Sequence, residues 1–106
     1  MKSMITFRHM AASPAVKEFV TERLEKLDRF GNKGKEAHVI LETEKYMHHA
    51  EVVLSSKNFK ARGKASTGDM YASIEEAITK VEKSLRKHHD KSVKAKNHAG
   101  RAAEAA

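Results

Sequence analysis

Cysteine and tryptophan are both absent from this 106-residue chain. Without cysteine there is no disulfide framework, no thiolate metal site and no thiol nucleophile, and such a composition suits a reducing cytosol. No stretch approaches the roughly 18 apolar residues that a membrane-spanning helix needs. The first ten residues, MKSMITFRHM, lack the long apolar segment of a signal peptide. These absences predict a soluble, cytoplasmic, single-domain protein with no membrane partner.

The seven histidines do not form a recognisable catalytic or metal site. His48 and His49 would point to opposite faces of a strand, and His88 and His89 would lie about 100° apart on a helix. No H-x-x-x-H or H-E-x-x-H spacing, G-x-S-x-G elbow, phosphate-binding loop or dinucleotide fingerprint occurs. We therefore expect no enzyme activity, no cofactor, no metal and no small-molecule substrate.

Positive charge is abundant and unevenly distributed. The net charge is +7, yet residues 1–56 hold nine Lys or Arg against eight Asp or Glu, whereas residues 57–101 hold twelve against five. Simple solubility would be served by an even distribution, so this asymmetry favours an extended anionic partner such as nucleic acid. Aromatic residues make up only 6% of the chain, which favours folded RNA bound through phosphates over single strands bound by base stacking.

Apolar periodicity predicts four strands and two helices. Period-two alternation indicates strands at 4–9, 37–42, 50–55 and 59–66, and the short connections near Tyr46 and Lys57 predict antiparallel hairpins between the last three. Ser13 and Pro14 are typical of a helix start, and an apolar stripe follows them as far as Gly31. That stripe contains Val16, Phe19, Val20, Leu24, Leu27 and Phe30.

A second helix is predicted from Asp69 as its N-cap, with apolar residues at helical spacing as far as Leu85. The order is therefore β-α-β-β-β-α, an α+β two-layer sandwich with two helices on one face of a four-stranded sheet. The apolar pattern ends near Asp90. We expect a single domain at 1–91 and a flexible Lys- and Ala-rich tail at 92–106.

The second predicted helix carries one face of cations opposite its apolar face. Helical geometry places Lys83, Lys87, Lys91 and Lys94 within about 60° of Lys80, and Arg86 farther round. Such a row could contact several phosphates at once. A solvated helix face with Glu76–Lys80 and Glu82–Arg86 pairs is the alternative, although most of the row has no acidic partner in sequence. His88 and His89 would extend the basic end of this helix.

Two further groups of cations have both a structural and a functional interpretation. Arg23 falls inside the apolar stripe of the first helix, either extending from the edge of the stripe or contacting phosphate alongside Lys26 and Arg29. Lys60, Arg62 and Lys64 share the predicted open face of the fourth strand, where they either bind RNA or discourage edge-to-edge aggregation.

Three segments within residues 4–91 together resemble the bacterial ribosome hibernation-promoting factor / ribosome-associated inhibitor family: SPAVKEFVTERLEKLDRF, HVILETEK and GDMYASIEEAITKVEKSLRKHHDK. Asp69-Met70-Tyr71-Ala72 at the start of a helix with a basic end is the most specific feature. The order β-α-β-β-β-α, predicted independently from periodicity, agrees with that family's double-stranded-RNA-binding-like fold. Because the chain ends near residue 106 in a Lys- and Ala-rich tail, it looks like the short form of a hibernation-promoting factor.

The resemblance implies a protein that binds the small ribosomal subunit in the mRNA and tRNA channel and inhibits translation in stationary phase or stress. It leaves open whether ribosomes are paired, together with a second small hibernation factor, or only inactivated singly. A generic duplex-RNA binder without ribosome specificity is the alternative. Asp69 and Tyr71 carry over as the motif, although capping and packing explain them equally well. The implied contacts to ribosomal RNA come from Arg23, Lys26, Arg29, Lys80, Lys83, Arg86, Lys87 and Lys91.

Overall fold

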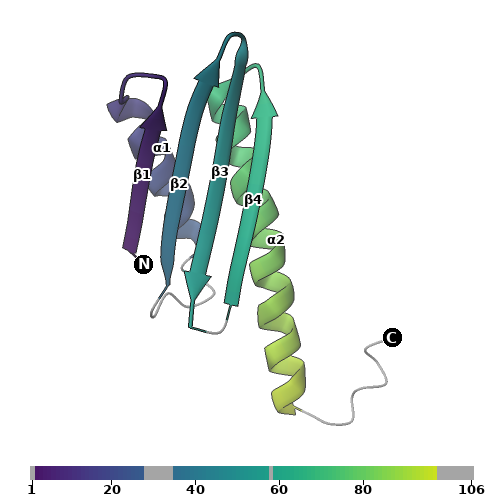
Figure 1. Cartoon of the computed structure of the whole chain (residues 1–106). Helices are drawn as coiled ribbons and strands as arrows, with labels where there is room; N and C mark the ends of the chain where they lie inside the picture. The colour runs from purple at the N-terminus through teal and green to yellow at the C-terminus, as the bar shows by residue number, and fades with distance from the viewer. Residues whose placement is uncertain (1, 28–34, 58, 98–106) are drawn as a thin grey trace.

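The computed structural model describes residues 2–27, 35–57 and 59–97, with 89–97 as backbone only. Its elements follow in the order β1 (Lys2–Arg8), α1 (Pro14–Glu25), β2 (Glu36–Glu44), β3 (Met47–Ser56), β4 (Phe59–Thr67) and α2 (Met70–Asn97). The sheet has the same spatial order, with β1 parallel to β2 and the other neighbours antiparallel. Both helices cover one face of the sheet (Figure 1), which confirms the predicted two-layer α+β fold.

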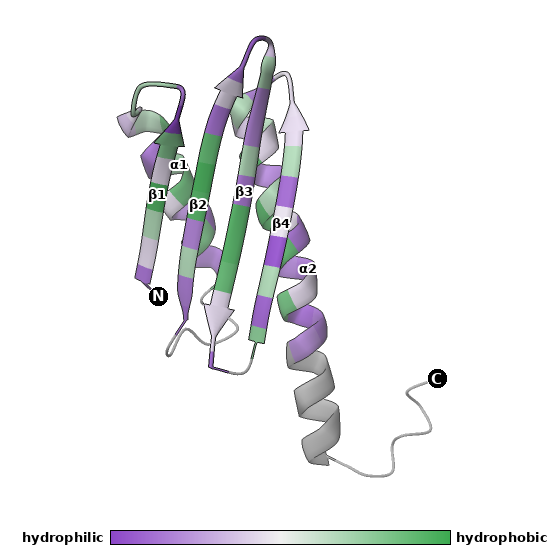
Figure 2. Cartoon of the chain, viewed as in Figure 1, coloured by the Kyte–Doolittle hydropathy of each residue, from purple (hydrophilic) through white to green (hydrophobic). Residues whose placement is uncertain are grey.

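The core lies between the helices and the inward face of the sheet. The central strands β2 and β3 contribute alternate residues that are fully or almost fully buried, and the hydrophobic colouring of these two strands is clear in Figure 2. The predicted apolar faces of both helices pack against them, because each helix has only one face that it can withdraw from water. The largest fully buried side chains are Leu27, Leu41, Leu54, Ile74, Val20, Val39, Val52 and Val81.

Several predicted boundaries shift by a few residues. β1 begins at Lys2, where it pairs with Glu36, and it ends at Arg8 because His9 adopts a left-handed conformation with φ 56°. The side chain of Ser13 accepts a hydrogen bond from the Val16 amide at 3.3 Å, so the predicted N-cap of α1 is confirmed. The predicted end of that apolar stripe, from residue 28 through Gly31, lies outside the described residues.

Helix α2 is longer than the apolar pattern predicts. Its backbone continues to Asn97, six residues into the segment 92–106 that we expected to be a flexible tail. Lys and Ala are strong helix formers, so this segment keeps helical propensity after its apolar residues end. Figure 1 shows the last part of α2 projecting beyond the beginning of β4. Residues 98–106 lie outside the described part of the chain, and the domain boundary at 91 stays a prediction.

Length alone does not make α2 a membrane segment. In the part of the chain that the structure describes, no helix is both long enough and apolar enough to cross a bilayer.

Helix α2 lies unusually close to β4 because the inward face of that strand carries only small residues at its centre. Ala61, Gly63 and Ala65 alternate there, and all three are buried. A Cβ atom built on Gly63 would come within 2.2 Å of the Ala77 carbonyl oxygen on α2. That oxygen belongs to the helix backbone and cannot rotate away. The glycine therefore sets how closely the second helix approaches the sheet.

We expect Gly63→Ala to lower the free energy of unfolding by about 1–3 kcal/mol or more, because α2 must shift to admit the methyl group. Urea denaturation followed by circular dichroism measures the loss. Gly68→Ala is the matched control, since a Cβ there meets no atom within 4 Å, and its effect should stay within about 0.5 kcal/mol. Equal losses for the two variants would show that close packing is not the role of Gly63.

Candidate nucleic-acid interface

The outward face of α2 presents lysines that are not neutralised by the rest of the fold. Lys83 and Lys87 are exposed, and neither has an ion-pair partner among the described residues. The apolar residues of the same helix face the sheet, so the lysines are held on the opposite side of a packed, fixed element. Hydrophilic colouring marks the stretch of α2 that lies near the beginning of β4 in Figure 2. The structure thus agrees with the predicted division of the helix into an apolar and a cationic face.

Lys80 is fixed by a contact that links α2 to the sheet. Its Nζ donates a hydrogen bond of 2.7 Å to the Lys64 carbonyl oxygen of β4. The helical pair Glu76–Lys80, considered from the sequence, is not the contact that forms. Since β4 is an edge strand, this bond occupies an edge carbonyl that would otherwise be open to another strand. Lys80 therefore stabilises the contact between α2 and β4, while its ammonium group stays at the surface.

The cations of β4 lie on the sheet face away from the helices, as predicted. Lys60, Arg62 and Lys64 are exposed and alternate with the buried residues of the strand. Arg62 is engaged by Glu51 of β3, with 3.0 Å between Nε and Oε2. The free edge of β4 is consequently flanked by cations on both sides, from the strand itself and from α2.

Two helix arginines of the predicted set, Arg23 and Arg86, lie in the described part of the chain, and both are engaged by carboxylates. Arg86 pairs with Glu82 one turn earlier on α2 at 3.3 Å, which confirms the expected i,i+4 pair. Arg23 of α1 reaches across to α2, where its Nη2 lies 3.3 Å from Oε2 of Glu75. Its guanidinium also lies over the Phe19 ring, 4.7 Å from the centroid. Arg23 thus connects the two helices in addition to any contact with RNA.

The remaining predicted cations are placed only in part. Lys26 is the exposed C-cap residue of α1, next to Arg23 on the helix layer. Arg29 lies outside the described residues, and the side chains of Lys91 and His89 do as well. His88 is half-buried and stacks on Phe59 of β4, with ring centroids 4.5 Å apart. That stacking gives His88 a packing role where α2 passes the first residue of β4.

Asp69 and Tyr71 act within the fold. The Asp69 carboxylate accepts a hydrogen bond of 3.1 Å from the Ala72 amide, as an N-cap does. The Tyr71 ring packs edge-on against Phe19, with centroids 4.9 Å apart. Next to them the fully buried Ser73 hydroxyl donates to the His48 carbonyl oxygen at 2.7 Å, which ties the start of α2 to β3. The motif thus anchors the basic helix at its first turn.

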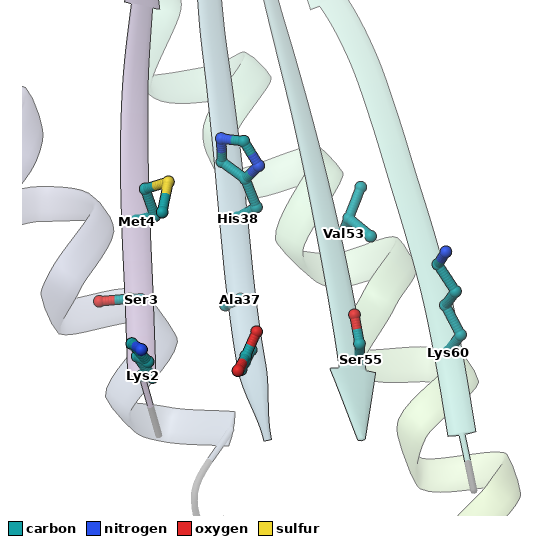
Figure 3. Close-up of a pocket in the computed structure, with 9 residues that line it drawn as sticks. Lys2, Ser3, Met4, Ala37, His38, Val53, Ser55 and Lys60 are labelled. Carbon is teal, nitrogen blue, oxygen red and sulfur yellow. The ribbon is translucent and has the colours of Figure 1, made fainter. Parts of the chain in front are cut away.

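The described residues include no group of three or more His, Asp or Glu side chains placed to hold a metal ion. A hollow of about 340 Å³ lies on the open face of the sheet. Figure 3 shows Met4, His38, Val53 and Lys60 extending into it from four different strands. The His38 ring is hydrogen-bonded to the Thr6 hydroxyl at 3.0 Å. Glu36, Ser3 and Ser55 also line this hollow, and no hydrogen bond or ion pair among the described residues joins them to His38.

Two contacts between elements, one joining α1 to α2 and one joining α2 to β4, could not be predicted from the sequence. Arg23 and Glu75 are 52 positions apart, and Lys80 bonds a backbone carbonyl that any residue would supply. The available signal was the placement of Arg23 inside an apolar stripe, which indicated that the side chain faces another element. Its partner depends on how the two helices cross.

Comparison with known proteins bears directly on this architecture. A family model described as "Sigma 54 modulation protein / S30EA ribosomal protein" matches residues 4–93. The chain belongs to this family. The predicted resemblance to ribosome hibernation factors is therefore confirmed, and the family is one of ribosome-associated factors and not of enzymes.

Individual relatives in the family are similar over most of the chain. The ribosome hibernation promoting factor of Escherichia coli (strain K12) is 32% identical over 91 residues, which cover 86% of this chain and 96% of that protein. The ribosome hibernation promotion factor of Lactococcus lactis is 29% identical over 91 residues, which cover 83% of this chain and 49% of that protein.

Solved structures agree on the fold. The Thermus thermophilus Protein Y N-terminal domain superposes with a TM-score of 0.76 at 23% identity, covering 83% of this chain and 99% of that one. A ribosomal subunit interface protein from Coxiella burnetii gives 0.75 at 20% identity, covering 83% and 97%. At these identities the likeness supports the hibernation-factor fold alone.

We expect Asp69→Ala to lower the free energy of unfolding by about 0.5–2 kcal/mol, because the first turn of α2 loses its cap. Asp69→Asn is the matched control: an amide oxygen still accepts the Ala72 amide, so the loss should be a few tenths of a kcal/mol. Thermal or urea unfolding distinguishes them. If Asn were as damaging as Ala, the family motif would need the negative charge itself and capping would not explain it.

Proposed function

We propose that this protein is a hibernation factor that binds the small ribosomal subunit in the mRNA and tRNA channel and thereby inhibits translation. It acts in the cytoplasm in stationary phase or stress. Ribosomal RNA is the partner that its surface suits, because a row of ammonium groups on a fixed helix can meet successive phosphates. The relatives named ribosome hibernation promoting factor support the same partner.

One observation carries the proposal: exposed cations flank the free edge of β4 on two elements that are packed rigidly together. On α2, Lys80 bonds a β4 carbonyl, and Lys83 and Lys87 follow it on the same helix with no ion-pair partner in the described part of the chain. Lys60 and Lys64 are exposed on β4 itself. Because α2 is held against β4 at Gly63, the backbone positions that carry these lysines are fixed before RNA arrives, so little backbone freedom is lost on binding.

Inhibition on this proposal needs no chemical step. A folded domain that fills an RNA-lined channel excludes messenger and transfer RNA by occupying the same volume and the same phosphates. Each lysine contact is individually weak in water, and affinity arises from several contacts made together. Competition with messenger and initiator transfer RNA is therefore the property that separates this function from generic RNA binding.

The decisive measurement is co-sedimentation of the full chain with ribosomes, isolated small subunits and an equal mass of naked duplex RNA at near-physiological salt. We expect the protein to pellet with ribosomes and small subunits, and to be released by messenger RNA plus initiator transfer RNA. Equal binding to all three samples would mean a generic duplex-RNA binder, and channel occupancy would have to be abandoned.

The double variant Lys83→Gln/Lys87→Gln should weaken binding to small subunits roughly tenfold or more, because two charge-assisted contacts are lost. The slope of log affinity against log salt should fall by about 1.4–1.8, for two phosphates no longer neutralised. Filter binding over a salt series measures both quantities.

The matched control is Lys2→Gln/Lys45→Gln, which removes the same charge at exposed positions away from the helices. Its affinity should change less than about twofold and its salt slope should stay the same. Equal losses for the two pairs would show that net charge matters and that α2 is not a defined binding face.

A further inference from the structure

The contact between Arg23 and Glu75 is incomplete as an arginine–carboxylate pair. A single nitrogen, Nη2, faces both carboxylate oxygens at 3.3 and 3.5 Å, whereas the strong bidentate arrangement uses two parallel N–H donors. The Nε atom of Arg23 is buried and has no hydrogen-bond partner among the described residues. Only Nη2 contacts Glu75, so the carboxylate engages one edge of the guanidinium and not two parallel donors.

The surroundings of Arg23 could accommodate a different anion. A depression of about 180 Å³ lies between α1 and α2, and Arg23, Lys26, Glu75 and Thr79 are among the residues that line it. The side chain of Arg23 is 30% exposed and that of Glu75 is 53% exposed, so the pair is open to solvent and weakly held. The Phe19 ring under the guanidinium keeps Arg23 in place when its anionic partner changes.

Glu75 also differs from its neighbour on the helix. Glu76 is also exposed but has no ion-pair partner in the described part of the chain, while Glu75 is directed to Arg23. A carboxylate in that position competes for the same donors as a phosphate oxygen, since both anions suit the planar guanidinium.

We propose that Glu75 is an internal competitor of RNA: its carboxylate occupies Arg23 in the free protein, and a phosphate of the bound RNA displaces it. This inference rests on the proposed function, because the phosphate belongs to the RNA that the lysines of α2 engage. Glu75 then tunes the affinity for RNA, because any RNA must displace its carboxylate to reach Arg23.

The test compares Glu75→Gln with the matched control Glu76→Gln by equilibrium binding to isolated small subunits at near-physiological salt. Both variants remove one negative charge from adjacent exposed positions of α2. We expect Glu75→Gln to bind roughly two- to fivefold more tightly than Glu76→Gln, the size of effect that an exposed ion pair has on an equilibrium. Thermal unfolding of each variant verifies that the compared proteins are folded.

The same two substitutions are then made in an Arg23→Met background, where the apolar stem over Phe19 is kept and the guanidinium is removed. There we expect the two variants to bind equally. The displacement of Glu75 by a phosphate is wrong if Glu75→Gln still binds more tightly than Glu76→Gln without Arg23, or if it binds no more tightly when Arg23 is present. If the unmodified protein does not bind small subunits, the proposed function is wrong, and the displacement that depends on it is wrong as well.

Discussion

The close approach of α2 to β4 at Gly63 is the constraint on which the rest of the structure depends. Because no Cβ intervenes, the backbone of the helix lies against the strand and its rotation about its own axis is determined. That rotation buries Ile74, Val81 and Leu85 and brings Lys80 to the carbonyl of Lys64. It also leaves the later lysines on the outside. The absence of a Cβ at Gly63 thus influences both which residues of α2 enter the core and which lysines stay exposed.

Charge on α2 is used differently along its length. Three carboxylates act within the fold: Asp69 caps the helix, Glu75 joins it to α1, and Glu82 pairs with Arg86. Lys83 and Lys87 have no equivalent partner in the described part of the chain. The Asp69 carboxylate also lies at the positive end of the helix dipole, which favours the helix.

Periodicity was sufficient to predict the fold, whereas the interface was predictable only where its contacts are local. The N-caps at Ser13 and Asp69 and the pair Glu82–Arg86 lie within four positions and follow from spacing alone. Arg23–Glu75 depends on the helix crossing, which no pattern within one segment contains. The extension of α2 to Asn97 was missed for another reason: loss of an apolar stripe marks the end of packing, not the end of helical propensity.

Arginines and lysines have different roles in this protein, because the chemistry of the two side chains differs. Each of Arg23, Arg62 and Arg86 pairs with a glutamate through its planar guanidinium. The Arg62 pair joins β4 to β3, the Arg86 pair lies within α2, and the exposed Arg23 pair lies between the two helices. An ammonium group on a flexible stem adapts to phosphates whose spacing the protein does not control. On the proposed function this matters, because a domain that must enter and leave an RNA channel benefits from several adaptable contacts on a frame that does not itself move. Rigidity then comes from the packed helix, and reversibility comes from the lysines.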